Sequence, residues 1–122
     1  MTIAPKVVAV IDDEGAMRKA IVRLLSANGF ATRDYASAEA FLDCPAARES
    51  ACLVLDVDLG GMSGVELHRR LKASGSKLPV IFITAIDHPA TQREAVDAGC
   101  IGYLPKPFPG NVLIGMIAKA TE

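Results

Sequence analysis

The 122-residue sequence has no tryptophan, few other aromatic residues and no excess of charge of either sign. Its 13 basic and 14 acidic side chains give a net charge of −1, whereas nucleic-acid binding by bulk charge needs a concentrated basic face. No apolar stretch approaches the roughly 20 residues that span a bilayer, and the N-terminal segment lacks the cleavage site of a signal peptide. We therefore expect no direct nucleic-acid partner and no membrane association.

Cysteine is also scarce. The three cysteines, Cys44, Cys52 and Cys100, are odd in number and show no CxxC spacing, which argues against a disulfide framework. Cys52 and Cys100 open apolar runs, where a buried thiol behaves as a small hydrophobe. Because free thiols are typical of a reducing compartment, we expect a cytoplasmic protein.

The chain is long enough for a single domain, 1–122, and we expect no effector domain within it. Four short apolar runs are rich in β-branched residues and continuous rather than alternating, which predicts strands buried on both faces of a parallel sheet. These runs are residues 7–11, 52–55, 79–83 and 100–104, and a more polar candidate for an edge strand is 31–35.

Amphipathic segments separate the predicted strands. Residues 14–28 place apolar side chains at the spacing of one helix face, and Asn28-Gly29 predicts the end of that helix. Ser37 and Ser63 can cap two further helices, and later helices are predicted for 89–98 and from about 109 onward. Strand and helix therefore alternate five times, which predicts a doubly wound α/β domain.

Polar side chains follow the apolar runs. Asp12, Asp13 and Glu14 follow the first run, Asp56 the run at 52–55, Thr84 the run at 79–83, and Lys106 the last run. Because the carboxyl ends of parallel strands meet at one edge of a sheet, we expect these side chains to lie together. A single acid after a strand is often only the cap of the next helix. The prediction of a site therefore depends on polar residues following all four apolar runs.

Such a cluster predicts a specific chemistry. Neighbouring carboxylates repel and raise each other's pKa unless a cation lies between them. Mg²⁺ is the hard cation that prefers oxygen ligands and phosphate partners. A metal, an ammonium group and a hydroxyl around one carboxylate suit phosphoryl transfer, with the carboxylate as the nucleophile.

The set Asp12-Asp13, Asp56, Thr84, Tyr103 and Lys106-Pro107 resembles the receiver domain of two-component response regulators, over essentially the whole chain. The runs LVLDVDLGGMSGVEL and LPVIFITA resemble the receivers of nitrogen-fixation-type transcriptional regulators. The resemblance implies a flavodoxin-like fold, in which a five-stranded parallel sheet of order 2-1-3-4-5 packs against five helices.

The resemblance also implies roles at the site. Asp56 would accept a phosphoryl group from the phosphohistidine of a histidine kinase or a phosphotransfer protein. Asp13, Asp56 and the backbone carbonyl of Asp58 would bind Mg²⁺, and Asp12 would act on the metal through water. Such a protein assists its own phosphorylation and dephosphorylation and is not a turnover enzyme.

A second group of residues would respond to phosphorylation. Thr84 would hydrogen-bond the phosphoryl group, Lys106 would pair with it, and Tyr103 would change rotamer as Thr84 moves. The Lys106-Pro107 bond is expected to be cis. The fourth helix (89–98), the fifth strand and the last helix would form the face for a downstream protein, an effector domain or a second phosphorylated copy.

Three positions depart from the usual pattern or vary within it. Position 60 is glycine where the family usually has proline, so the loop after Asp56 is less restrained at Gly60. Asp58 and Ile86 occupy the two variable positions that tune hydrolysis of the acyl phosphate in the family. We expect the bulky Ile86 to slow that hydrolysis.

Three alternatives stay open at this point. Asp56-Val57-Asp58 is a DxD motif, as in haloacid-dehalogenase-type phosphatases, although it follows the third predicted strand rather than the first. A receiver fold can also serve as an interaction module that is not phosphorylated. A histidine phosphotransfer protein would use His68, but such proteins are all-helical, so we expect His68 and His88 to be ordinary surface residues.

Overall fold

A parallel sheet forms the centre of the computed structural model, which describes residues 5–85 and 89–122. The strand order is β2-β1-β3-β4-β5, which confirms the expected flavodoxin-like order. The order reverses at β1, so the crevice beyond the ends of β1 and β3 is the expected ligand position. The strands are β1 (Val7–Ile11), β2 (Ala31–Tyr35), β3 (Cys52–Asp56), β4 (Val80–Thr84) and β5 (Gly102–Pro105).

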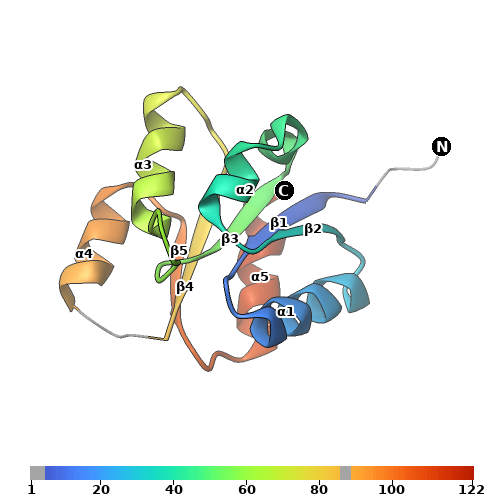
Figure 1. Cartoon of the computed structure of the whole chain (residues 1–122). Helices are drawn as coiled ribbons and strands as arrows, with labels where there is room; N and C mark the ends of the chain where they lie inside the picture. Colours follow the sequence, from blue (N-terminus) through green and yellow to red (C-terminus); the bar gives the residue numbers. More distant parts are fainter. Residues whose placement is uncertain (1–4, 86–88) are drawn as a thin grey trace.

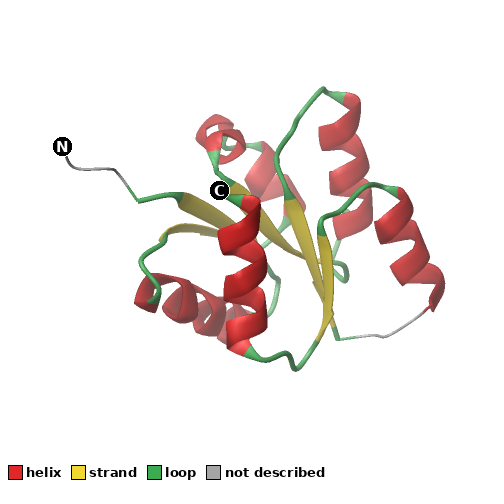
Figure 2. Cartoon of the chain, turned by 180° about the vertical axis from the view of Figure 1, so that it is seen from behind, coloured by secondary structure: helices red, strands yellow, loops and turns green. Residues whose placement is uncertain are grey.

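Helices cover both faces of the sheet, as Figures 1 and 2 show from opposite sides. The α-helices α1 and α5 pack on one face, and α2, α3 and α4 pack on the other together with the 3₁₀ helix η1. The helices are α1 (Gly15–Ala27), α2 (Ala38–Leu42), η1 (Pro45–Glu49), α3 (Gly64–Ala73), α4 (Pro89–Asp97) and α5 (Gly110–Ala120).

The core consists of two layers, one on each side of the sheet. Val8 and Val10 of β1 face α1 and α5, whereas Ala9 and Ile11 face the opposite layer, as the two-residue period of a strand requires. All residues of β3 and β4 are buried. The apolar runs at 52–55 and 79–83 therefore belong to strands covered on both faces, as predicted. The prediction is wrong for the run at 100–104, because β5 lies at the edge of the sheet and only Leu104 of that strand is buried.

The predicted element boundaries hold to within one or two residues. Ser37 and Ser63 cap α2 and α3, since their hydroxyls accept hydrogen bonds from the backbone of Ala40 and Glu66. Strands β3 and β4 each extend one residue further than predicted, so Asp56 and Thr84 are the last residues of their strands. Helix η1 was not predicted, and Pro45 at its first turn was the available signal.

Within residues 5–85 and 89–122, no helix has both the length and the apolar character needed to cross a bilayer. The three cysteines all lie in this part of the chain and are free thiols.

Candidate functional site

The polar residues that follow the strands converge at one edge of the sheet. Asp56 ends β3 and lies opposite Ile83 of β4, and Thr84 ends β4 opposite Pro105 of β5. Asp12 follows β1 directly, and β1 pairs with β3 in parallel. The expected convergence of side chains at the carboxyl edge is therefore present in the structure.

Three carboxylates form the centre of this edge. Asp12, Asp13 and Asp56 each offer an oxygen, and these oxygens all lie within 4.8 Å of one another. Asp12 is fully buried and Asp56 is 4% exposed, whereas Asp13 is exposed to solvent. An oxygen donor set that is buried on one side and open on the other fits a hard divalent cation such as Mg²⁺, which usually keeps several waters.

Lys106 joins the two buried carboxylates. Its Nζ lies 2.9 Å from Asp12 Oδ2 and 3.1 Å from Asp56 Oδ2. Burial alone would lower the pKa of Lys106, but hydrogen bonds to Asp12 and Asp56 and their charges raise it above its ordinary value. The ammonium group therefore stays charged and offsets part of the repulsion between the acids. The Lys106-Pro107 bond is cis, as expected.

Both oxygens of Asp56 have partners. Oδ1 accepts a hydrogen bond of 2.9 Å from the backbone N–H of Asp58, and Oδ2 pairs with Lys106. Burial nevertheless raises the Asp56 pKa to about 6, with a smaller upward contribution from Asp12, and the two hydrogen-bond donors only partly oppose this. The site therefore holds a carboxylate whose ionised form a further cation would favour.

Asp12 is held in place by its own neighbours. Its Oδ1 accepts a hydrogen bond of 2.9 Å from the backbone N–H of Glu14. Arg18 of α1 donates from Nη1 to the backbone oxygen of Asp12 at 2.9 Å and from Nε to Asp34 of β2 at 3.0 Å. The sequence reading missed Arg18, whose position one turn into the helix after the acidic run was the available signal.

Thr84 is fully buried, and its hydroxyl donates a 3.1 Å hydrogen bond to Asp58 Oδ2. The backbone oxygen of Thr84 accepts from the Lys106 N–H at 2.7 Å. Tyr103 of β5 is half-buried and packs against the layer under α2, α3 and α4. Thr84 and Tyr103 lie on adjacent strands, because β4 pairs with β5. Their roles in switching stay predictions.

The loop after Asp56 depends on glycine at two places. A Cβ on Gly64 would collide with the backbone oxygen of Asp56, so only glycine lets α3 begin this close to the site. Gly61 has φ +80°, and a Cβ there would lie 2.6 Å from Glu39 Oε2. Glu39 of α2, which the sequence reading also missed, accepts a 3.4 Å hydrogen bond from the N–H of Met62.

The expectation that His68 is a surface residue is wrong. His68 is only 1% exposed and packs edge-to-face on Phe82 of β4, with ring centroids 5.5 Å apart. The physical reason is helical spacing, since His68 lies three residues from both Val65 and Leu71 on the buried face of α3. Burial, and secondarily the charge of Lys72, lower the His68 pKa. His88 and Ile86 lie outside the described residues.

Comparisons with known proteins agree with this arrangement. The family model described as "Response regulator receiver domain" matches residues 8–118. The transcriptional regulatory protein FixJ of Bradyrhizobium diazoefficiens is 37% identical over 111 residues, covering 91% of this chain and 54% of that protein. FixJ of Rhizobium meliloti is 38% identical over 115 residues, covering 94% of this chain and 56% of that protein. The chain thus spans about half the length of these relatives.

Among solved structures, the crystal structure of FixJ-N superposes with a TM-score of 0.87 at 36% identity, covering 98% of this chain and 95% of that one. The expected resemblance to FixJ-like regulators is thereby confirmed. On the family match, the FixJ relatives and this structural similarity, the chain belongs to the response regulator receiver domains.

Proposed function

We propose that the chain accepts a phosphoryl group on Asp56 from the phosphohistidine of a histidine kinase or a phosphotransfer protein. The observation that carries this proposal is the setting of Asp56. Its carboxylate lies at the end of a buried strand, 3.1 Å from Lys106 Nζ, and shares an oxygen cluster with Asp12 and Asp13. A regulatory domain of this kind controls partners and is not a turnover enzyme.

In the proposed transfer, an oxygen of Asp56 attacks phosphorus and the phosphorus–nitrogen bond of the phosphohistidine breaks. The electron pair of that bond stays on the imidazole nitrogen, which then takes a proton, and Asp56 carries an acyl phosphate. Lys106 is placed to pair with the phosphoryl oxygens because it already contacts Asp56 Oδ2. Burial of Asp56 and Asp12 limits the water that would compete with these charges.

Asp13, Asp56 and the backbone carbonyl of Asp58 would bind Mg²⁺, with Asp12 acting through water. The cluster of three carboxylate oxygens fits this cation. When bound, Mg²⁺ would offset negative charge on the phosphoryl oxygens and on the carboxylates around it.

The partner carrying the phosphohistidine must approach beside Lys106. An apolar groove of about 180 Å³ lies there, between α1 and the segment that follows β5. Its walls include Met17 and Leu24 of α1 and Phe108 two residues after Lys106. We propose that this groove receives an apolar side chain of the phosphodonor protein. The transfer would take place in the cytoplasm.

The response to phosphorylation would be read on the face formed by α4, β5 and α5. Thr84 would turn to the phosphoryl group and Tyr103 would follow. The large hydrophobic residues that are exposed in the described part of the chain are Val96, Ile101 and Val112, on α4, just before β5 and on α5. Exposed apolar side chains on these three elements support a protein partner there. That partner would be a downstream protein, an effector domain or a second phosphorylated copy.

If the chain were an interaction module that is not phosphorylated, Asp56 would accept no phosphoryl group. One experiment separates this alternative from the proposal. Incubation with acetyl phosphate and Mg²⁺, followed by intact-mass measurement, should show a gain of one phosphoryl group in the wild type and none in Asp56→Asn. Asp43→Asn changes an exposed aspartate at the end of α2 and should match the wild type. A wild type that gains no mass, or an Asp56→Asn variant that gains it equally, would refute the proposal.

A further inference from the structure

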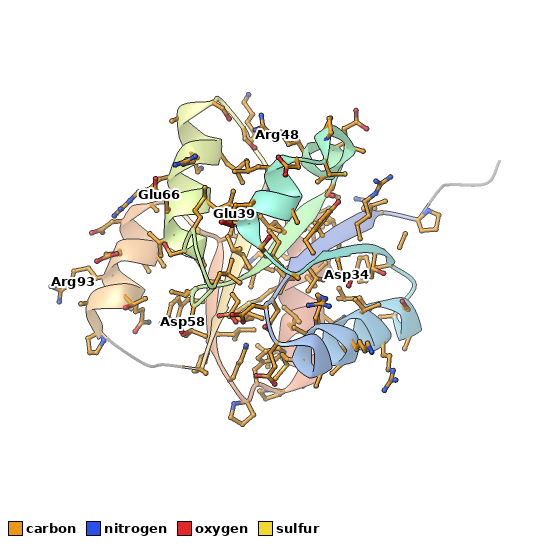
Figure 3. The ribbon with its side chains drawn as sticks, in the orientation of Figure 1. Asp34, Glu39, Arg48, Asp58, Glu66 and Arg93 are labelled. Atoms are coloured by element: carbon orange, nitrogen blue, oxygen red, sulfur yellow. The ribbon has the colours of Figure 1, made fainter. Side chains whose placement is uncertain are left out.

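The carboxylate of Asp58 takes part in a contact that neither metal binding nor phosphoryl transfer requires. Its Oδ2 accepts the hydrogen bond of the Thr84 hydroxyl at 3.1 Å, across 26 residues of sequence. Thr84 is fully buried, whereas Asp58 lies at the exposed side of the site, where Figure 3 labels it. A hydrogen bond from a buried hydroxyl to a charged acceptor is stronger than one between neutral groups.

The backbone around this contact is anchored on both sides. The Asp58 N–H donates to Asp56 Oδ1 at 2.9 Å, and the Thr84 carbonyl accepts from the Lys106 N–H at 2.7 Å. A change of partner for the Thr84 hydroxyl is therefore a matter of side-chain rotation rather than strand movement. A hydroxyl has one proton to donate, so a donor engaged by Asp58 is not available to a phosphoryl oxygen.

We propose that the Asp58 carboxylate is a positioning residue that holds the Thr84 hydroxyl in the unphosphorylated state. The inference rests on the proposed phosphorylation of Asp56. A phosphoryl group on Asp56 brings roughly −1.5 to −2 charges next to Asp58 and offers oxygens that are better acceptors. Repulsion between the two anions and the exchange of acceptors then release Thr84 together, so Asp58 sets how far the resting state is favoured.

The inference has a direct consequence for affinity. Binding of a phosphoryl analogue must break the Thr84–Asp58 hydrogen bond, so removing the Asp58 acceptor should tighten that binding. A hydrogen bond of net strength near 1 kcal/mol corresponds to about 3- to 10-fold in a dissociation constant. Part of any gain will come from the lost negative charge alone, and the experiment has to separate the two causes.

The separation uses Asp58→Ala and Asp58→Asn, each made with Thr84 and with Thr84→Val. Both Asp58 variants remove the charge, but asparagine keeps an oxygen that can accept the hydroxyl proton. The measurement is the dissociation constant for beryllium trifluoride with Mg²⁺. We expect Asp58→Ala to bind about 3- to 10-fold more tightly than Asp58→Asn when Thr84 is present, and this ratio to disappear with Thr84→Val. Asp43→Ala, an exposed aspartate outside the site, is the control for charge and should bind as the wild type does.

A second measurement needs no ligand. Three-bond couplings by NMR report the side-chain rotamer of Thr84 in the unliganded protein. We expect one rotamer in the wild type and in Asp58→Asn, and averaging in Asp58→Ala. A single rotamer in all three, or an affinity ratio that survives Thr84→Val, would overturn the role of Asp58. If the wild type binds no analogue, the proposed phosphorylation fails, and the unliganded couplings still decide whether Asp58 holds Thr84.

Discussion

At Asp56 a carboxyl group is buried beside both a cation and a second carboxylate, and burial has the larger effect. Lys106 and the Asp58 N–H favour the ionised form, yet the pKa is raised to about 6 because of burial first and Asp12 last. The folded chain thus keeps an acid in a setting that disfavours its charge. A residue with such a perturbed pKa is a candidate functional residue. A cation that binds beside Asp56 would stabilise its ionised form.

This pKa predicts how stability varies with pH. The folded-state value of about 6 lies above the ordinary 3.8, so between these values the folded state binds a proton more tightly than the unfolded state. The contribution of Asp56 to the free energy of unfolding should therefore fall as pH rises from about 4 to about 6. In buffer with a chelator, the advantage of Asp56→Asn over the wild type should grow over this window by up to about 3 kcal/mol.

Urea unfolding of both proteins at pH 4.5 and 7.5 measures this difference. His68 titrates in the opposite sense, because its lowered pKa makes the folded state lose stability as pH falls below about 6.5. His68 is common to both proteins, so its contribution cancels in the comparison. An advantage of Asp56→Asn that is equal at the two pH values would show that Asp56 has no raised pKa.

Single residues of the site differ in how well sequence reasoning found them. Asp12, Asp13, Asp56 and Lys106 were predictable because each lies at or just after the end of an apolar run, and parallel strands bring such positions together. The Asp58–Thr84 hydrogen bond was not predictable, because it depends on the rotamers of two side chains 26 residues apart. Neither the DxD pattern nor the glycine spacing predicts that hydrogen bond.

At the scale of the elements, the loop between β3 and α3 combines two kinds of glycine. A Cβ at Gly60 would meet nothing within 4 Å, and Gly60 does not have a positive φ. Gly64, at the first position of α3, has the backbone oxygen of Asp56 against it. The loop is therefore free to vary at its start and closely packed at its end.

Alanine substitutions should separate these two positions. Gly60→Ala should stabilise the fold by about 0.4 to 1 kcal/mol, because it reduces the freedom of the unfolded chain at no steric cost. Gly64→Ala should destabilise the fold by more than about 1 kcal/mol and weaken Mg²⁺ binding, because α3 must move away from Asp56. Thermal unfolding with and without Mg²⁺ measures both effects. Equal behaviour of the two variants would contradict the packing described for Gly64.

The elements themselves were largely predictable, for reasons that also explain the errors. Continuous apolar runs marked β3 and β4, but Asp56 and Thr84 are polar, so hydropathy ended both strands one residue early. The start of β5 was placed too early, because Cys100 and Ile101 are apolar but precede the strand at Gly102. Apolar character shows burial, whereas strand limits depend on backbone pairing.

At the scale of the whole molecule, the proposed partner face formed by α4, β5 and α5 carries exposed apolar side chains. Ile101 is 50% exposed and Val96 57% exposed, values that are high for large apolar side chains. Helices α1 and α5 carry one core layer and α4 belongs to the other, so this face spans both layers at the β5 edge (Figures 1 and 2). A partner bound to this face would therefore contact elements from both core layers.

Replacing Ile101 by serine tests the use of this face. The change should alter the free energy of unfolding by no more than about 0.5 kcal/mol, because Ile101 is a surface residue. Phosphorylation of Asp56 should proceed at the wild-type rate, while self-association of the phosphorylated chain, measured by sedimentation, should weaken several-fold. Val22→Ser, at a half-buried apolar residue of α1 outside the proposed face, is the control and should associate as the wild type does. Unchanged association of Ile101→Ser would place the contact elsewhere.

Helix α4 buries very little side-chain surface against the rest of the protein. Its residues are all described, and Ala95 is the one that is buried, whereas α3 buries five. A methyl group contributes about 0.8 kcal/mol when it is removed from water, so a shift or partial unwinding of α4 would sacrifice little of the energy that keeps the chain folded. The molecule can therefore reshape its outer rim while its interior stays as it is.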